Sequence, residues 1–206
     1  MRMSQALTTG IIAIDLQSEF MGEGALFPVP GSERIVREAN IFIRKAREHG
    51  ATVIFTAFAV PDSQPLGLST TRLGVTSAHR YPHAALVVNL DRTESDIVVE
   101  KPRQSAFVGT ALELILRRKG IEHLVILGVT THACCLATAF DAGALDFRVT
   151  VLSDLTASPS VPAKDRLPAM TADEAHLAAL QFIGLNGRVA LSDDVLRELA
   201  KNVEEG

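Results

Sequence analysis

Short apolar runs alternate along the chain with longer segments in which apolar residues recur every three or four positions. The short runs predict strands and the periodic segments predict helices, because side-chain directions repeat about every 2 residues in a strand and about every 3.6 in a helix. The predicted strands are residues 10–16, 52–59, 96–100, 123–129, 148–153 and 188–191. The predicted helices are residues 32–49, 109–119, 133–145, 171–183 and 192–202.

The predicted strands are continuous apolar runs rather than alternating ones, which is typical of a parallel sheet covered by helices on both faces. Alternation of strands with helices therefore predicts one doubly wound, Rossmann-like α/β domain over residues 1–206. It has three layers and a mainly parallel central sheet. Residues 60–95 are irregular, and unstructured connections of that length are uncommon unless they are functional. We expect them to form an inserted loop that covers the substrate.

Composition excludes several classes of protein. The 206 residues are 47% hydrophobic, and 24 acidic against 20 basic residues leave a formal charge of −4. This mild acidity gives no electrostatic reason to expect nucleic acid or an anionic membrane as a partner. The apolar run at residues 10–14 is far too short to span a bilayer and has no leader-peptide cleavage site, so a cytoplasmic location is expected.

The two cysteines, Cys134 and Cys135, are neighbours. Consecutive Cα atoms lie about 3.8 Å apart, which is less than the roughly 4.4–6.8 Å usual for a disulfide. A disulfide-stapled secreted framework is therefore excluded, and a reducing compartment is the simplest interpretation.

Three reactive side chains follow three predicted strands, namely Asp15, Lys101 and Cys134. The carboxyl ends of parallel strands meet at one edge of the sheet, where ligands bind. A cation and a helix N-terminus both lower the pKa of a thiol, and Cys134 is expected in the first turn of the helix over residues 133–145. Asp15 is suited to accept the thiol proton, and the backbone N–H groups of Thr130 and Cys134 to hold an oxyanion. The pattern therefore predicts covalent nucleophilic hydrolysis.

Three segments together resemble the isochorismatase-like cysteine hydrolase superfamily: IIAIDLQSEF (11–20), EKPRQSAFVGTALELIL (100–116) and LVILGVTTHACCLATAFDA (124–142). The resemblance covers roughly residues 8–200. It implies that Asp15, Lys101 and Cys134 form a catalytic triad. It also implies a cis peptide bond between Val129 and Thr130 that turns the amides toward the oxyanion.

The chain departs from the family pattern in two places. Nicotinamidases of this superfamily carry metal-binding Asp and His residues after the second strand, whereas residues 57–63 here contain no histidine. We therefore expect no metal and no other cofactor. His132 and Cys135 resemble the pattern of true isochorismatases, whose thiol comes one residue later and whose nucleophile position holds glycine. Because Cys134 fills that position here, Cys135 is interpreted as a buried packing residue.

Four further residues are candidates for the substrate pocket: Gln17, Phe20, Phe107 and His132. Each also has a structural interpretation, Gln17 and the two phenylalanines as core residues and His132 as a turn residue. The sequence leaves both interpretations open.

The predicted function is cleavage of a C–N bond in a small amide, carbamoyl or ureido compound through a thioester on Cys134. One alternative is hydrolysis of an isochorismate-like vinyl ether with Asp15 as the acid. Another is a non-enzymatic ligand-binding module of the same fold. Dinucleotide binding is disfavoured, because Gly-x-Gly-x-x-Gly does not follow the first strand. The positive mean hydropathy and the resemblance together favour a homo-oligomer, a dimer or a tetramer.

Overall fold

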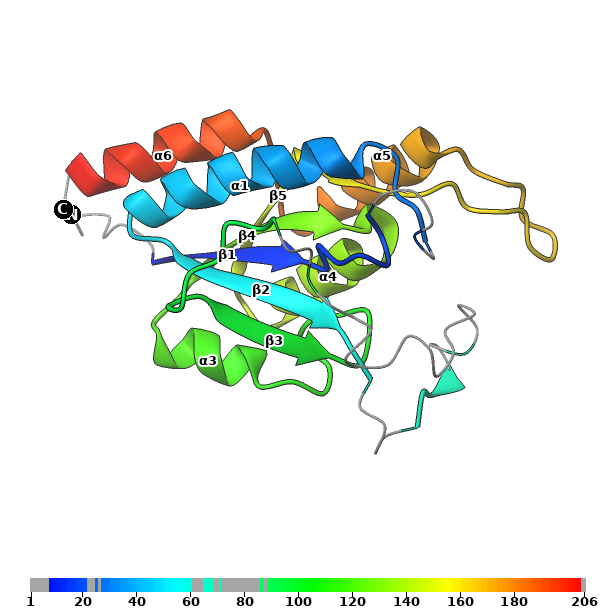
Figure 1. Cartoon of the computed structure of the whole chain (residues 1–206), viewed down its shortest axis with the longest axis horizontal. Coiled ribbons are helices and arrows are strands. Elements are labelled where there is room, and N and C mark those ends of the chain that lie inside the picture. The colour runs from blue at the N-terminus through cyan, green and yellow to red at the C-terminus, as the bar shows by residue number, and fades with distance from the viewer. Residues whose placement is uncertain are drawn as a thin grey trace.

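The computed structural model describes residues 8–21, 25, 27–60, 65–68, 71, 86 and 89–204. In this part of the chain, six parallel strands form one sheet in the order β3-β2-β1-β4-β5-β6 (Figure 1). The strands are β1 (Thr9–Ile14), β2 (Thr52–Phe58), β3 (Ile97–Lys101), β4 (His123–Val129), β5 (Arg148–Ala157) and β6 (Arg188–Ala190). The helices are α1 (Ser32–Glu48), α3 (Leu112–Arg118), α4 (Leu136–Ala144), α5 (Ala172–Ile183) and α6 (Ser192–Glu204).

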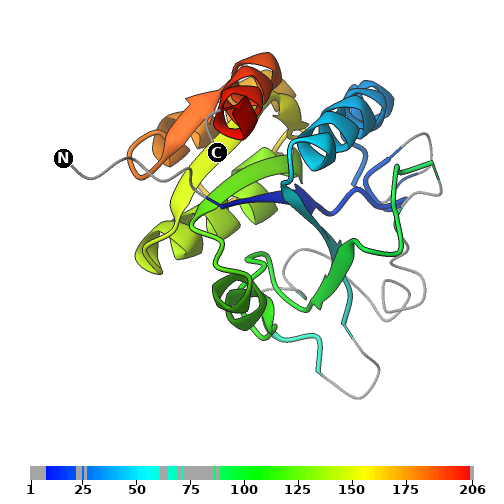
Figure 2. The same cartoon turned by 90° about the vertical axis from the view of Figure 1, so that its left-hand side faces the viewer.

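Two hydrophobic cores lie on opposite faces of the sheet, because successive strand residues point to opposite sides. Ile11 and Ala13 of β1 pack in the core formed with α1 and α6. Ile12 and Ile14 pack in the core formed with α3, α4 and α5. Figure 2 shows the helices separated into these two outer layers. The three-layer, doubly wound α/β fold predicted from the sequence is confirmed.

The strand order reverses between β1 and β4, where the chain continues from one half of the sheet to the other. Gly128 of β4 pairs with Ile14 at this point and has a φ of +111°. A Cβ atom on Gly128 would lie 2.1 Å from the backbone oxygen of Ile14, so only glycine fits. In open α/β sheets, this reversal marks the crevice in which ligands bind.

The predicted elements are confirmed, and most of their ends differ by one to three residues. One difference lies after β4, where residues Thr131–Cys135 form a π-helical turn and α4 begins at Leu136. The other lies in β5, which continues to Ala157 because its register against β4 shifts between Ile126 and Gly128.

The predicted covering loop lies mostly outside the described residues. Of residues 60–95, the structure describes 60, 65–68, 71, 86 and 89–95, so the covering role of the loop stays a prediction. Leu86 forms an isolated antiparallel bridge with Gln17. Within the described ranges, every helix is too short or too polar to cross a membrane.

Candidate active site

Asp15 immediately follows β1 and has a φ of 49°, in the left-handed region that aspartate enters more readily than most residues. Its side chain is completely buried. The hydroxyl of Thr56, in the adjacent strand β2, donates to Asp15 Oδ1 at 2.7 Å. The backbone N–H of Asp15 in turn donates to the backbone oxygen of Thr56 at 3.2 Å. Thr56 therefore fixes both the backbone and the carboxylate of Asp15.

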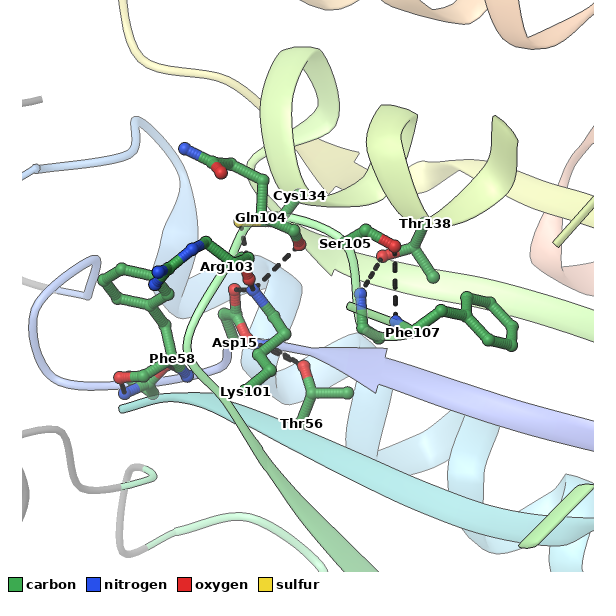
Figure 3. A network of polar contacts seen from close by, with 12 residues as sticks. Asp15, Thr56, Phe58, Lys101, Arg103, Gln104, Ser105, Phe107, Cys134 and Thr138 are labelled. Atoms are coloured by element: carbon green, nitrogen blue, oxygen red, sulfur yellow. Dashed lines mark hydrogen bonds and ion pairs between the residues drawn. The ribbon is translucent and has the colours of Figure 1, made fainter. Parts of the chain in front are cut away.

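Lys101 is the last residue of β3, and its side chain is also completely buried. It reaches across the end of β2, where its Nζ lies 5.2 Å from the centre of the Phe58 ring. The Nζ forms an ion pair with Asp15 Oδ2 at 2.7 Å. It also donates to the backbone oxygens of Arg103 and Gln104, each at 3.0 Å (Figure 3). These contacts hold a charged ammonium group inside the protein.

Cys134 completes the cluster, because its Sγ lies 3.3 Å from Lys101 Nζ. It belongs to the π-helical turn and not, as expected, to the first turn of an α-helix. The backbone oxygen of Thr130 accepts from the N–H groups of both Ala133 and Cys135, at 3.2 and 3.1 Å. The peptide bond between Val129 and Thr130 is cis. The three residues singled out from the ends of strands thus lie together at one site.

The electrostatics of the site keep the thiol protonated in the free protein. Burial and the Asp15 carboxylate raise the pKa of Cys134 to about 12, although the Lys101 ammonium acts in the opposite direction. Burial would lower the pKa of Lys101, but the negative charge of Asp15 and the hydrogen bonds to Asp15 and Cys134 outweigh it, and the pKa is raised. The expectation of a lowered thiol pKa is therefore wrong, because burial exceeds the effect of the cation. Nucleophilic attack by this thiol consequently requires a base to accept its proton.

A cavity of about 100 Å³ opens beside Cys134. Most of its wall is apolar, and the described residues that line it are Phe20, Phe27, Phe58, Gln104, Thr130, His132, Ala133, Cys134 and Pro159. The rings of Phe20 and Phe27 stack with their centres 6.1 Å apart. The arrangement suits a small compound with its reactive carbon held against the sulfur.

Two of the four pocket candidates, Phe20 and His132, line this cavity. Gln17 does not, because its side-chain amide is bonded to the backbone N–H and carbonyl of Phe58, at 2.6 and 3.2 Å. Phe107 does not either, because its ring stacks on Phe147 and points away from Lys101 and Cys134 (Figure 3). Gln17 and Phe107 therefore have structural roles, which was one of the two interpretations that the sequence left open for each of them.

The sequence analysis missed Thr56 and Phe58. A threonine within the apolar run of β2, in register with Ile14, was the available signal for Thr56. Cys135 is completely buried in the core with α3, α4 and α5, and burial raises the pKa of its thiol. Among the residues that the structure describes, no three His, Cys, Asp or Glu side chains are grouped as metal ligands.

The family model described as the isochorismatase domain matches residues 9–181, which include all three clustered residues. The chain belongs to the isochorismatase family. It is 32% identical to the ureidoacrylate amidohydrolase RutB of Pantoea ananatis, over 72% of this chain and 68% of that protein. It is 35% identical to a probable inactive nicotinamidase of Arabidopsis thaliana, over 73% of this chain and 81% of that protein.

Solved structures of the isochorismatase family share this fold. An isochorismatase-like hydrolase from Alkaliphilus metalliredigens superposes with a TM-score of 0.79 at 26% identity, covering 93% of this chain and 98% of that one. A cysteine hydrolase from Pseudomonas syringae gives a TM-score of 0.86 at 23% identity, covering 97% of this chain and 100% of that one. The protein is therefore an isochorismatase-family hydrolase.

Proposed function

We propose that this hydrolase cleaves the C–N bond of a small amide or ureido compound through a covalent intermediate on Cys134. The observation that carries the proposal is the buried contact series from Asp15 Oδ2 to Lys101 Nζ at 2.7 Å and from Nζ to Cys134 Sγ at 3.3 Å. This series of contacts lies beside a largely apolar cavity. The 32% identity to a ureidoacrylate amidohydrolase supports a ureido compound as the first substrate to test.

In the proposed reaction, Asp15 takes the thiol proton as Cys134 Sγ attacks the carbonyl carbon. A C–S bond forms, and the C=O π electrons move onto the oxygen, which the backbone N–H groups of Thr130 and Cys134 stabilise. When the intermediate collapses, the C–N bond breaks and Asp15 returns the proton to the leaving nitrogen. Water then attacks the thioester or thiocarbamate with Asp15 as the base, and the thiol is regenerated. Lys101 remains protonated and stabilises the negative charge on Asp15 or sulfur.

Ammonia release from a panel of ureidoacrylate, maleamate, N-carbamoyl amino acids and nicotinamide tests the reaction. We expect turnover of at least one member by the wild type and none by Cys134→Ala. Cys135→Ala is the matched control. It should keep most of the activity, because Cys135 packs in the core and does not line the cavity.

The covalent intermediate on Cys134 can be detected directly. Mass spectrometry of the acid-quenched enzyme should find the acyl or carbamoyl group on the peptide that contains Cys134. Full activity in both cysteine variants would contradict the mechanism.

Hydrolysis of a vinyl ether that survives alkylation of both thiols would favour an isochorismatase-type reaction with Asp15 as the acid. Ligand binding without any turnover would favour a binding module.

A further inference from the structure

His132 stands out in the cavity wall, because its contacts reveal which ring nitrogen carries hydrogen. Its backbone N–H donates to the hydroxyl oxygen of Ser158 at 3.2 Å. Its Nδ1 lies 3.0 Å from the same oxygen. Ser158 directly follows β5, and only 2% of its surface is exposed. One buried hydroxyl therefore contacts His132 twice.

The hydrogen-bonding capacity of Ser158 decides the direction of the second contact. A serine hydroxyl has one hydrogen to donate and two lone pairs to accept with, whereas a backbone N–H can only donate. If Nδ1 also donated to Ser158, the serine hydrogen would be buried with no acceptor among the described residues, an arrangement that native proteins avoid. Ser158 therefore donates to Nδ1. A neutral imidazole whose Nδ1 accepts must carry its hydrogen on Nε2.

The surroundings of the ring make this hydrogen available to a ligand. Burial lowers the pKa of His132, so the ring is neutral at neutral pH. No described residue accepts a hydrogen bond from Nε2. The adjoining wall is apolar at Phe20, Phe58 and Pro159, and Cys134 is two residues away along the π-helical turn. His132 thus adds an oriented N–H donor to a largely apolar wall that also contains Gln104 and Thr130.

We propose that Ser158 fixes His132 in the Nε2–H tautomer, and that this N–H selects substrates carrying a hydrogen-bond acceptor beyond the bond that is cleaved. A carboxylate oxygen is the strongest such acceptor. The selection of substrates rests on the proposed hydrolase function, whereas the tautomer assignment is independent of it. His132 is in this account a specificity-determining residue and takes no part in proton transfer to the leaving nitrogen.

The tautomer is tested by long-range ¹H–¹⁵N NMR spectra of the labelled protein at neutral pH. The His132 ring signals are assigned by their loss in His132→Gln. We expect the Nε2–H pattern in the wild type and in Ser158→Thr, which keeps a hydroxyl, and a mixture of tautomers in Ser158→Ala. An Nδ1–H or a doubly protonated ring in the wild type would overturn the assignment. This measurement needs no turnover.

The selection is tested with ureidoacrylate and (Z)-1-propenylurea, in which a methyl group replaces the carboxylate. His132→Leu should lower kcat/KM for ureidoacrylate about tenfold and leave that for propenylurea within about threefold, because only ureidoacrylate loses a hydrogen bond. His132→Gln places an amide N–H near the position of Nε2 and should restore most of the difference. Equal effects on both compounds would refute selection by His132. Absence of turnover of any panel compound by the wild type would contradict the proposed function alone, with the tautomer still decided by the spectra.

Discussion

At the scale of single residues, the buried ion pair of Lys101 and Asp15 is a strong energetic constraint. Both side chains are completely buried, so removing one partner leaves an uncompensated charge in a low-dielectric interior. We expect Lys101→Met to lower the free energy of unfolding by about 3–5 kcal/mol. Adding Asp15→Asn to this variant should recover part of that loss, since no charge is then left unpaired.

Urea unfolding measures both effects. Arg188→Met is a suitable comparison, because it removes one partner of the exposed Arg188–Glu198 ion pair and should change stability by less than about 1 kcal/mol. Similar losses for Lys101→Met and Arg188→Met would show that the buried pair contributes no more than a surface contact.

Thr56 is predicted to act through the Asp15 carboxylate. Thr56→Val keeps the side-chain shape but removes the hydroxyl that donates to Oδ1 at 2.7 Å. One lost hydrogen bond to a charged acceptor corresponds to about 1.5–3 kcal/mol, so kcat should fall by roughly ten- to a hundredfold. KM should change little, because Thr56 is not among the described residues that line the cavity. Thr56→Ser keeps the hydroxyl, and steady-state kinetics should find it close to the wild type; equal losses in both variants would instead indicate disturbed packing.

At the scale of elements, the sequence predicted every strand of the sheet and missed two local irregularities. The periodicity of the sequence identifies where apolar faces lie, but it does not reveal a local π-helical turn or a shift in the register between two strands. In β5, Asp154 suggests the end of a strand, yet its carboxylate accepts from the backbone N–H and hydroxyl of Ser192 at the start of α6. The polar side chain of Asp154 can therefore lie inside β5 because its partner, Ser192, is a residue 38 positions later in the chain.

Gly128 gives a test at the same scale, because it lies where β4 approaches β1. Gly128→Ala combines a positive φ with a Cβ atom 2.1 Å from the Ile14 oxygen, so the two strands must separate. We expect a loss of stability of about 3 kcal/mol or more, with a loss of activity in any protein that still folds.

The matched control for this variant is Gly120→Ala. Gly120 also has a positive φ, of +64°, but a Cβ atom there would meet nothing within 4 Å. This substitution should cost only about 1–2 kcal/mol from the backbone conformation. Thermal unfolding compares the two variants, and equal losses would mean that close approach of the strands adds nothing to the backbone term.

At the scale of the whole molecule, parallel topology explains which parts of the site were predictable. Asp15, Lys101 and Cys134 lie together because each is at, or shortly after, the carboxyl end of a strand, and these ends lie at the same edge of the sheet. The direction of each strand suffices for that prediction. The cavity wall depends on register and on side-chain direction, which the sequence pattern does not fix. For that reason the sequence left Phe107 open as a pocket candidate, whereas Phe58 and the partner of His132, Ser158, were overlooked.

Burial of both thiols predicts how stability of the whole molecule varies with pH. In the unfolded chain, each cysteine ionises near pH 8.5. In the folded protein, burial raises the pKa of Cys134 to about 12 and that of Cys135 well above its ordinary value. Above about pH 8.5 the unfolded state has therefore lost protons that the folded state retains. Stability is greatest below that pH and should fall by about 1.4 kcal/mol per pH unit for each thiol.

Urea unfolding between pH 7 and pH 10 tests this, with Cys135→Ala and the double variant Cys134→Ala/Cys135→Ala as comparisons. The slope against pH above 8.5 should be about half as steep in the single variant and nearly flat in the double variant, whatever their stabilities at pH 7. The raised pKa of Lys101 adds a further loss only above about pH 10.4, where lysines of the unfolded chain begin to lose their protons. A slope unaffected by removing both thiols would mean that they ionise equally in the two states, and that the active-site sulfur is far better solvated than its buried position indicates.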